Sequence, residues 1–432
     1  MNSLEYGWKL YSSGHFELAE QIFKNIIETD DDSRAYDGLG VTLVEQKKCK
    51  EALAYFNKAG EILRNEITNV SCNRARCLAD MGMAKESLVM LDSLIKAYPG
   101  HTVARYNRGL VYLQMCRYSE AIEEMNFVLA AEPNNDKAKF GRGFANLVLG
   151  RYEPGFRDYE FRHKGDVVTP EAPEWTGDED IKGRTILVVC DMGYGDNIMF
   201  GRYLPLLVER GADVLVYAPP SLEPLYSQIE GVRVVFTHEV RVDYFIRCMS
   251  LAAAFKTTIN TVPKPMPIWP ESQKWEKRFK DDGKLRVGLC WTGSTKSFYD
   301  EHRSIPLEML RPLFMDGITF YSLQKEVRDS DREAFNSLPL VDLASEFDTF
   351  ADTAGAMVHL DRIVTVDTSV AHLAGTLGVP TTVLLTAYRT YWLWISGINT
   401  TPWYPSINVI KQDVDGNWSD VVEQVRQQLA SE

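Results

Sequence analysis

Two hydrophobic periodicities divide the chain. From its start to about residue 160, apolar residues recur at the three-to-four-residue spacing of amphipathic helices. Beyond about residue 165, short aliphatic and β-branched runs alternate with longer amphipathic segments, which predicts strands alternating with helices. We therefore expect an α-helical N-terminal region followed by an α/β region with parallel sheets.

The helical pattern is itself repeated. Small residues stand at Gly7, Gly40, Ala75, Gly109 and Gly143, at successive steps of 33, 35, 34 and 34 residues. A period near 34 residues is typical of the tetratricopeptide repeat, a pair of antiparallel helices. We expect small residues to permit close helix approach, and large residues to fill the groove against the next repeat. The small set also includes Ala52 and Ala121, and the large set is Phe23, Phe56, Leu91 and Met125.

The last copy of the repeat, residues 149–164, is degenerate. It carries Pro154 and Gly155 where the second helix of a regular repeat would begin. We interpret this segment as a capping element that docks the repeats onto the following domain. Such a solenoid presents a concave surface for peptides or partner proteins. A generic helical bundle is the alternative interpretation, and the regular period argues against it.

The first α/β half opens with a buried strand over residues 184–190. The loop Asp191-Met-Gly-Tyr-Gly-Asp196 follows it and leads into a helix expected over residues 197–210. Gly193 and Gly195 suit a tight turn and close approach of a ligand. Asp196 can take a proton from an incoming hydroxyl group, or it can cap the helix, and the two roles are compatible. The glycine spacing is not G-x-G-x-x-G, which argues against a nicotinamide- or flavin-dependent enzyme.

Three further apolar runs, residues 213–217, 232–236 and 243–246, predict the remaining strands of this half. The segment 262–270 contains four prolines in nine residues, so it can form neither a helix nor a central strand. We interpret it as a linker to a second α/β half.

The second half begins with a strand over residues 285–291. A loop rich in Gly, Ser and Thr follows over residues 292–304 and contains Lys296 and Arg303. Cations at the carboxyl edge of a sheet are suited to phosphate contacts. A solvated loop is the alternative for either residue taken alone.

Residues 361–386 are the most informative stretch of this half. A buried strand leads into a helix that we expect Asp367 to cap, and a second buried strand follows. Thr368 and Ser369 fall in the first helical turn, and His372 lies one turn further on the same face. Free N–H groups and the helix dipole at such a turn favour a phosphate. An ordinary helix cap with a core-facing histidine is the alternative.

Other elements of this half lie on both sides of that stretch. A strand over residues 317–324 ends in Gln324, and helices are expected over residues 350–360 and 418–429. The dense aromatic segment 388–394 suggests core or interdomain packing, with contact to a base or sugar as the alternative.

Charge and composition limit the classes of function. The net charge of −13 disfavours broad contact with nucleic acid but leaves a local basic cleft open. The chain lacks an apolar run of about 18 residues, and its N-terminal segment lacks the apolar core of a signal peptide, so we expect a cytoplasmic protein. The seven cysteines form no C-x-x-C pair, which favours buried thiols over disulfides or a zinc site.

These motifs occur together, in an order that resembles the GT-B glycosyltransferases of the heptosyltransferase-like family, in the form that carries N-terminal tetratricopeptide repeats. The chain is also similar, more distantly, to the protein O-GlcNAc transferases. The motifs are Asp196, the 296–304 loop, SLQ (322–324), FADTAG (350–355), VDTSVAHLAG (366–375) and TPWYPS (401–406). The resemblance covers about residues 165–430 and implies a tetratricopeptide α-solenoid followed by a GT-B fold of two Rossmann-like α/β domains. The implied boundaries are residues 1–162 for the repeats, 163–265 for the acceptor half and 266–432 for the nucleotide-sugar half.

The resemblance implies an inverting transfer of a sugar from a nucleoside-diphosphate sugar to an acceptor hydroxyl group. Asp196 matches the acidic residue that the family uses as general base, and Asp367 and Gln324 would orient the donor. The implied diphosphate ligands are Lys296, Arg303, Thr368, Ser369 and His372. The charges of Lys296 and Arg303 would stabilise the leaving group, so the resemblance implies neither a metal nor another cofactor.

Two segments depart from the family pattern. Relatives typically carry D-W-R-W where this chain has Thr390-Tyr-Trp-Leu-Trp394, so we expect a different pocket wall near the base or sugar. The degenerate fifth repeat weakens the case for an acceptor-peptide role. The sequence Asp413-Val-Asp415 has the D-x-D form of a GT-A metal site but lies in a predicted turn, so we interpret it as structural.

The leading hypothesis is therefore a glycosyltransferase whose repeats bind the acceptor or a partner protein. The alternative is a non-catalytic scaffold with a vestigial GT-B domain, because a fold does not by itself imply activity. The retention of Asp196, Lys296, Arg303 and His372 together favours the enzyme. The donor base and sugar stay open, and so does the acceptor: a lipid-linked saccharide, a protein side chain, a small molecule or a modified nucleobase.

Overall fold

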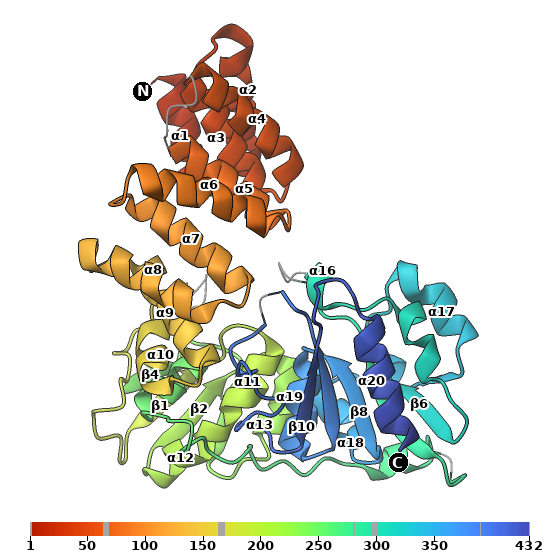
Figure 1. Cartoon of the computed structure of the whole chain (residues 1–432). Coiled ribbons are helices and arrows are strands. Elements are labelled where there is room, and N and C mark those ends of the chain that lie inside the picture. Colours follow the sequence, from red (N-terminus) through yellow and green to blue (C-terminus); the bar gives the residue numbers. More distant parts are fainter. Residues whose placement is uncertain are drawn as a thin grey trace. The chain divides into compact units, whose positions relative to one another are not determined.

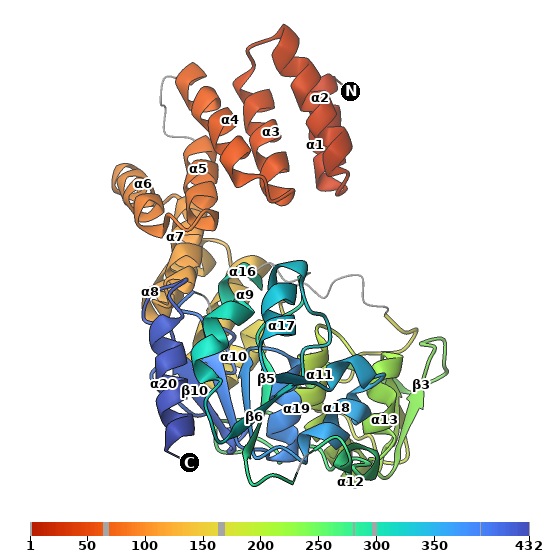
Figure 2. The ribbon, with the colours of Figure 1, turned by 90° about the vertical axis from the view of Figure 1, so that its right-hand side faces the viewer.

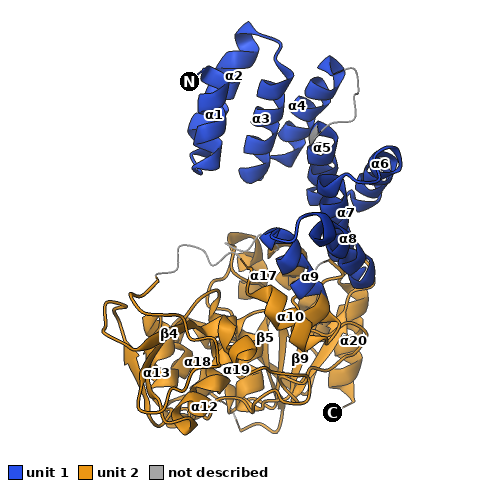
Figure 3. Ribbon diagram, turned by 90° about the vertical axis from the view of Figure 1, so that its left-hand side faces the viewer, with its two compact units in different colours: residues 1–145 blue, residues 146–432 orange. Residues whose placement is uncertain are grey.

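The computed structural model describes residues 2–63, 69–162, 169–279, 281–295, 300–388 and 390–431. The chain forms two compact units, Met1–Ala145 and Asn146–Glu432, which are coloured separately in Figure 3. The boundary between them falls inside helix α9 (Asp136–Val148). Helix α10 (Tyr152–Tyr159), which the repeat pattern assigns to the fifth copy, belongs to the second unit.

The first unit is a stack of antiparallel helix pairs, as the period predicts. Neighbouring helices from α1 to α4 pack side by side (Figure 2). A Cβ atom added at Gly40 would lie 2.4 Å from Phe56 Cε1, so the absent side chain permits the close approach. The bounds are α1 (Ser3–Ser12), α2 (Phe16–Thr29), α3 (Ser33–Glu45), α4 (Cys49–Ile62), α5 (Asn69–Asp80), α6 (Ala84–Ala97), α7 (Thr102–Gln114) and α8 (Tyr118–Ala131).

The large residues of the repeat fill the grooves as expected. Phe23, Phe56, Leu91 and Met125 are all fully buried. They are buried at equivalent positions of successive repeats, in three apolar clusters of the first unit. The prediction of a tetratricopeptide-like solenoid is therefore confirmed.

The second unit contains two parallel sheets, the smaller of which has the order β3-β2-β1-β4 (Figure 1). Its strands are β1 (Thr185–Val189), β2 (Asp213–Tyr217), β3 (Val232–Val235) and β4 (Tyr244–Arg247). In the register, Leu187 lies opposite Leu215 on one side and Phe245 on the other. The aliphatic runs predict all four of these strands.

The larger sheet has the order β10-β9-β8-β5-β6-β7 and is also parallel throughout. Its strands are β5 (Leu285–Cys290), β6 (Ile318–Ser322), β7 (Leu340–Asp342), β8 (Arg362–Val366), β9 (Thr381–Leu385) and β10 (Ile407–Lys411). The edge strands β7 and β10 are additions to the elements that we predict. The core of this sheet includes Val287, Leu289, Val364 and, from the C-terminal helix, Val421 and Val425.

Helices connect and cover these strands. The α-helices after α10 are α11 (Tyr194–Phe200), α12 (Leu204–Glu209), α13 (Glu223–Tyr226), α14 (Leu251–Ala254), α15 (Gln273–Glu276), α16 (Asp300–Arg303), α17 (Arg332–Ser337), α18 (Phe350–Met357), α19 (Ser369–Leu377) and α20 (Ser419–Ala430). The 3-10 helices are η1 (Gly201–Tyr203), η2 (Pro220–Leu222), η3 (Cys248–Ser250), η4 (Leu307–Leu313), η5 (Asp329–Asp331) and η6 (Ala344–Glu346). The segment predicted as one helix over residues 197–210 is helical, but it begins three residues earlier and is divided into α11, η1 and α12.

Helix α10 is fixed to the second unit by aromatic packing. The Phe156 ring lies edge-on to Trp392 at a centroid distance of 5.5 Å, and Trp403 Nε1 donates to Tyr152 Oη over 2.8 Å. The two tryptophans are fully buried, so the aromatic segment after β9 is part of the core. The degenerate copy thus docks onto the α/β region, as we infer from its sequence.

The proline-rich segment 262–270 contains no helix or strand, in agreement with prediction. Among the described residues, no helix combines the length and the apolar character that crossing a membrane requires.

Candidate functional site

The candidate site lies where a turn from each sheet comes together. One turn connects β1 to α11, and the other connects β8 to α19. The two helices pack directly against each other: a Cβ atom added at Gly195 would lie 2.6 Å from His372 Cδ2. Because both turns follow the carboxyl ends of parallel strands, they occupy the position where ligands bind in open α/β sheets.

The turn after β1 is built differently from our prediction. Met192 adopts the left-handed conformation, with φ of 64°. Gly193 is extended, with φ of −82° and ψ of 166°. The left-handed residue of this turn is therefore Met192, and the expectation that the glycines form the tight turn is wrong. The absent Cβ at Gly195 instead makes room for the imidazole of His372.

Asp196 lies in the first turn of α11 and is partly buried. Its Oδ2 atom accepts a hydrogen bond from the backbone N–H of Gly193 over 3.0 Å. Its Oδ1 atom accepts from the Tyr391 hydroxyl group over 2.5 Å. The N-cap of α11 is Gly193 and not Asp196, which occupies the third helical position and accepts from the N–H of the N-cap residue. A distant tyrosine also holds the Asp196 side chain.

The surroundings of Asp196 favour its protonated form. Burial raises the pKa of its carboxyl group to about 6, and the nearby charges of Asp367 and Asp191 also raise it. The hydrogen bonds from Tyr391 and Gly193 oppose this shift because they stabilise the carboxylate. A carboxyl group with a pKa near neutral can both accept and release a proton at physiological pH.

The turn after β8 carries Asp367, Thr368 and Ser369. The N-cap of α19 is Thr368, with extended backbone angles, and not Asp367 as we predict. Thr368 Oγ1 lies 3.3 Å from Thr365 Oγ1, within hydrogen-bonding distance. The Asp367 carboxyl group has a raised pKa because it is buried, and Arg303 and the Trp394 indole act against that rise.

The Trp394 indole lies beside this turn. Its side chain is 3% exposed, and within the described part of the chain its Nε1 atom has no hydrogen-bond partner of normal geometry. The indole N–H nevertheless interacts with the Asp367 carboxyl group, whose pKa it lowers. Trp394 therefore helps to stabilise the ionised form of Asp367.

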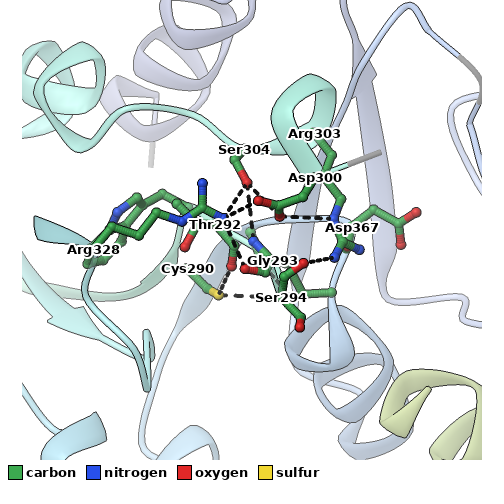
Figure 4. A network of polar contacts seen from close by, with 12 residues as sticks. Cys290, Thr292, Gly293, Ser294, Asp300, Arg303, Ser304, Arg328 and Asp367 are labelled. Atoms are coloured by element: carbon green, nitrogen blue, oxygen red, sulfur yellow. Dashed lines mark hydrogen bonds and ion pairs between the residues drawn. The ribbon is translucent and has the colours of Figure 1, made fainter. Parts of the chain in front are cut away.

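Arg303 is brought to the same turn by a polar network around the loop after β5 (Figure 4). Its Nη1 atom donates to the Asp367 carbonyl oxygen over 2.9 Å. The guanidinium lies over Gly293, where an added Cβ atom would be 2.3 Å from Nη2. Asp300 holds the network together: its Oδ2 atom accepts from Arg328 Nη2 over 2.5 Å, and its Oδ1 atom lies 3.7 Å from Arg303 Nε.

Of the two further donor-site residues, Gln324 is placed differently from our expectation. Lys296 lies outside the described residues. Gln324 is buried and committed to the protein: its Oε1 atom accepts from the N–H groups of Trp291 and Thr292 over 3.1 and 3.0 Å. These bonds fix the start of the loop that carries Arg303, so Gln324 acts here through the loop.

His372 follows the core-facing alternative. The ring is 4% exposed, and Nδ1 lies 3.3 Å from the Tyr404 hydroxyl group. Burial and the charge of Arg202 lower the pKa of the imidazole to about 3, so it is neutral at physiological pH. A diphosphate contact from His372 stays a prediction, and in this structure the ring packs α19 against α11.

Sequence reasoning did not identify Tyr391 or Trp394 as site residues, although it marked their segment as a departure from the family pattern. Their contacts join residues far apart in the chain, and Tyr391 is separated from Asp196 by 195 positions. A single sequence contains no signal for such a pairing.

The Asp413–Asp415 turn has a structural contact. Asp415 Oδ2 lies 2.7 Å from His302 Nδ1, and its Oδ1 atom accepts from Thr386 Oγ1 over 2.9 Å. Among the residues that the structure describes, there is no group of three or more His, Cys, Asp or Glu side chains suited to hold a metal ion.

Comparison with known proteins identifies the repeats. Residues 106–153 match the family model of the tetratricopeptide repeat. Over 461 residues the chain is 23% identical to the protein FlbA of Caulobacter vibrioides, covering 95% of this chain and 75% of FlbA.

Two solved structures match part of the chain at low similarity. A thermophilic tetratricopeptide-repeat protein of Thermus thermophilus is 19% identical and covers 37% of this chain and 87% of its own, with a TM-score of 0.34. MamA of Desulfovibrio magneticus RS-1 is 20% identical and covers 38% and 95%, with a TM-score of 0.31. The match to the family model and the buried repeat residues together show that the N-terminal region is a solenoid of tetratricopeptide type. Such a solenoid presents a surface suited to binding other proteins.

Proposed function

We propose that the chain transfers a sugar from a nucleoside-diphosphate sugar to an acceptor hydroxyl group, with inversion at the anomeric carbon. The observation that carries this proposal is the meeting of two strand-to-helix turns, which brings the proton-accepting Asp196 close to Asp367 at the start of α19. A base beside an anion-binding helix start is the arrangement that such a transfer requires.

The donor's diphosphate would bind at the start of α19. Free N–H groups of the first helical turn and the positive end of the helix dipole favour an anion there. Thr368 and Ser369 add hydroxyl groups, and Arg303 adds a positive charge that its bond to the Asp367 carbonyl oxygen holds at this turn. Lys296 is assigned to this site by resemblance alone.

Asp196 would act as the general base. It takes the proton of the acceptor hydroxyl group while that oxygen forms a bond to the anomeric carbon. The bond between the anomeric carbon and the diphosphate breaks at the same time, and its electron pair leaves with the nucleoside diphosphate. The cationic group at the start of α19 would stabilise that developing negative charge, so the reaction as proposed needs no metal.

The proposal extends to the fold and to the repeats. The two parallel sheets would be the two Rossmann-like halves of a GT-B enzyme, with the smaller sheet on the acceptor side and the larger one on the nucleotide side. The repeats would bind the acceptor or a protein that presents it. A cytoplasmic location follows from the proposed soluble donor.

A non-catalytic scaffold is the second candidate. The commitment of His372 and Gln324 to internal contacts favours it, because two residues assigned to the donor by resemblance serve packing here. Under this candidate the α/β region would stabilise the repeats or sense a nucleotide without turnover.

The test is nucleoside-diphosphate release from UDP-, GDP-, ADP-, CDP- and dTDP-sugars, with saccharide, peptide and lipid-linked acceptors supplied. We expect one donor class to turn over, and Asp196→Asn to abolish release while donor binding survives. Asp178→Asn is the matched control, because Asp178 is exposed and paired with Lys256 away from the site. Unchanged turnover in Asp196→Asn would remove that residue from the mechanism.

A further inference from the structure

Asp196 is held from the opposite half of the second unit by a single side chain. The Tyr391 hydroxyl group donates to Asp196 Oδ1 over 2.5 Å, and Tyr391 follows β9 of the larger sheet, whereas Asp196 follows β1 of the smaller one. The Tyr391 pKa is raised well above its ordinary value by burial and by the charge of Asp196, so the phenol keeps its proton and is the donor.

We propose that Tyr391 is a positioning residue that holds the Asp196 carboxylate ionised and in one orientation toward the acceptor hydroxyl group. This inference rests on the function proposed above. Tyr391 touches the base and acts on the reaction through it.

The count of acceptor sites on the carboxylate supports this role. An ionised carboxylate has about four lone-pair sites, two on each oxygen. Tyr391 uses one on Oδ1, and the Gly193 N–H uses one on Oδ2. Both torsion angles of Asp196 are then fixed, and each oxygen retains one site that can receive the acceptor's proton.

The groups around Asp196 explain why the tyrosine matters. Among the described residues, six titratable side chains interact electrostatically with Asp196. They are Asp191, Asp367, Tyr159, Tyr391, Tyr404 and Cys248. Asp191 and Asp367 disfavour the carboxylate, and burial does so more strongly. Tyr391 and the Gly193 N–H are the hydrogen bonds that favour it. Without the tyrosine, one backbone donor would have to oppose burial and two carboxyl groups.

The proton balance is unchanged by this role. The acceptor's proton moves to Asp196 as its oxygen bonds to the anomeric carbon, and water takes the proton after the product leaves. Tyr391 keeps its own proton throughout. Its contribution is to stabilise the ionised base before the transfer, because hydrogen bonds to a charged form lower the pKa of an acid.

The first test does not require catalysis. The difference in the free energy of unfolding between the full-length wild type and Asp196→Asn, measured across pH 4–9, reports the titration of Asp196. The same difference is then measured between Tyr391→Phe and the double variant Asp196→Asn/Tyr391→Phe. We expect the midpoint to move to higher pH in the Tyr391→Phe background, by about one pH unit for a charged hydrogen bond worth about tenfold.

Tyr203→Phe is the matched control. Tyr203 is fully buried in the same unit and bonds Thr257 over 2.8 Å, so its loss removes a buried tyrosine hydrogen bond without touching Asp196. The proposal would be overturned if the Asp196 titration had the same midpoint in the Tyr391→Phe background as in the wild type. In that case Tyr391→Phe would only lose stability, as Tyr203→Phe does.

The second test is the pH profile of transfer. We expect kcat/KM of Tyr391→Phe to fall about fivefold at pH 6 and by little at pH 8, because the base is ionised again at higher pH. Equal losses at both pH values would overturn the positioning role. If the wild type transfers no sugar, the proposed function fails, whereas the unfolding titration still decides whether Tyr391 holds Asp196 ionised.

Discussion

Gly195 on α11 faces His372 on α19 at a distance that leaves no room for a side chain. An added Cβ atom would lie 2.6 Å from His372 Cδ2 and 3.1 Å from its Nε2. The imidazole cannot move easily because it is buried and its Nδ1 atom lies 3.3 Å from the Tyr404 hydroxyl group. This contact fixes the two turns of the candidate site relative to each other.

We therefore expect Gly195→Ala to lower the free energy of unfolding by about 1–3 kcal/mol, the usual effect of overpacking a core contact. Gly100→Ala is the control, because a Cβ atom there meets nothing within 4 Å. That variant should stay within about 0.5 kcal/mol of the wild type in urea denaturation. Equal stability of the two variants would show that α11 and α19 are not closely packed in solution.

His372→Ala should destabilise the protein at pH 7, by about 1–3 kcal/mol for a cavity and a lost hydrogen bond. It should also reduce the sensitivity to acid. The folded pKa is lowered to about 3. The unfolded chain therefore binds more protons between pH 3 and about 6.5, and stability is lost as the pH falls through that range. His15→Ala, at an exposed helix cap, is the control. If His372→Ala leaves the melting temperature unaltered but weakens nucleotide binding, His372 contacts the nucleotide and is not a core residue.

Asp196 should give the opposite pH dependence. Its folded pKa is raised to about 6, above an ordinary value near 4. The folded state binds more protons in this range, so the contribution to stability is present at low pH and is lost as the pH rises from about 4 to 6. The slope is at most about 1.4 kcal/mol per pH unit. His372 acts in the opposite sense, so the effect of Asp196 is measured as the free energy of unfolding of Asp196→Asn minus that of the wild type. This difference should increase with pH and level off above pH 6. A difference independent of pH would contradict the raised pKa.

Gln324→Ala should be strongly destabilising, by about 2–4 kcal/mol, because it leaves the buried N–H groups of Trp291 and Thr292 without their acceptor. Gln412→Ala is a comparison with a buried glutamine that accepts one N–H group, from Ala387 over 3.2 Å, and should lose less. Urea denaturation measures both. A stable Gln324→Ala variant with impaired donor binding would support direct contact between Gln324 and the donor.

The repeats and most strands are predictable because their signals are local. The 34-residue spacing of small residues and the runs that form β1, β5, β8 and β9 are visible in a few residues at a time. Edge strand β10 does not alternate strictly, because Val409 and Ile410 are both buried. This short run between turn-rich segments therefore gives only a weak strand pattern.

The candidate site is predictable only in part. Asp196, Asp367 and Thr368 follow strands, so topology alone brings them to the sheet edges. Whether His372 faces a ligand or the core depends on Gly195, a residue of another helix. The contact of Tyr391 with Asp196 depends on how two sheets meet, which no local pattern specifies.

The proposed donor site is tested most directly by a thermal-shift titration of the full-length protein with UDP, ADP, GDP, CDP and dTDP, with and without EDTA. We expect one diphosphate to stabilise the chain, by about 2.7 kcal/mol at about 100 times Kd, and EDTA to have no effect. Arg303→Ala should abolish the shift, whereas Arg332→Ala, an exposed arginine 3.6 Å from Asp329, should retain it. If none of the nucleotides shifts the transition of the wild type, the transferase account is contradicted, and the scaffold function takes its place.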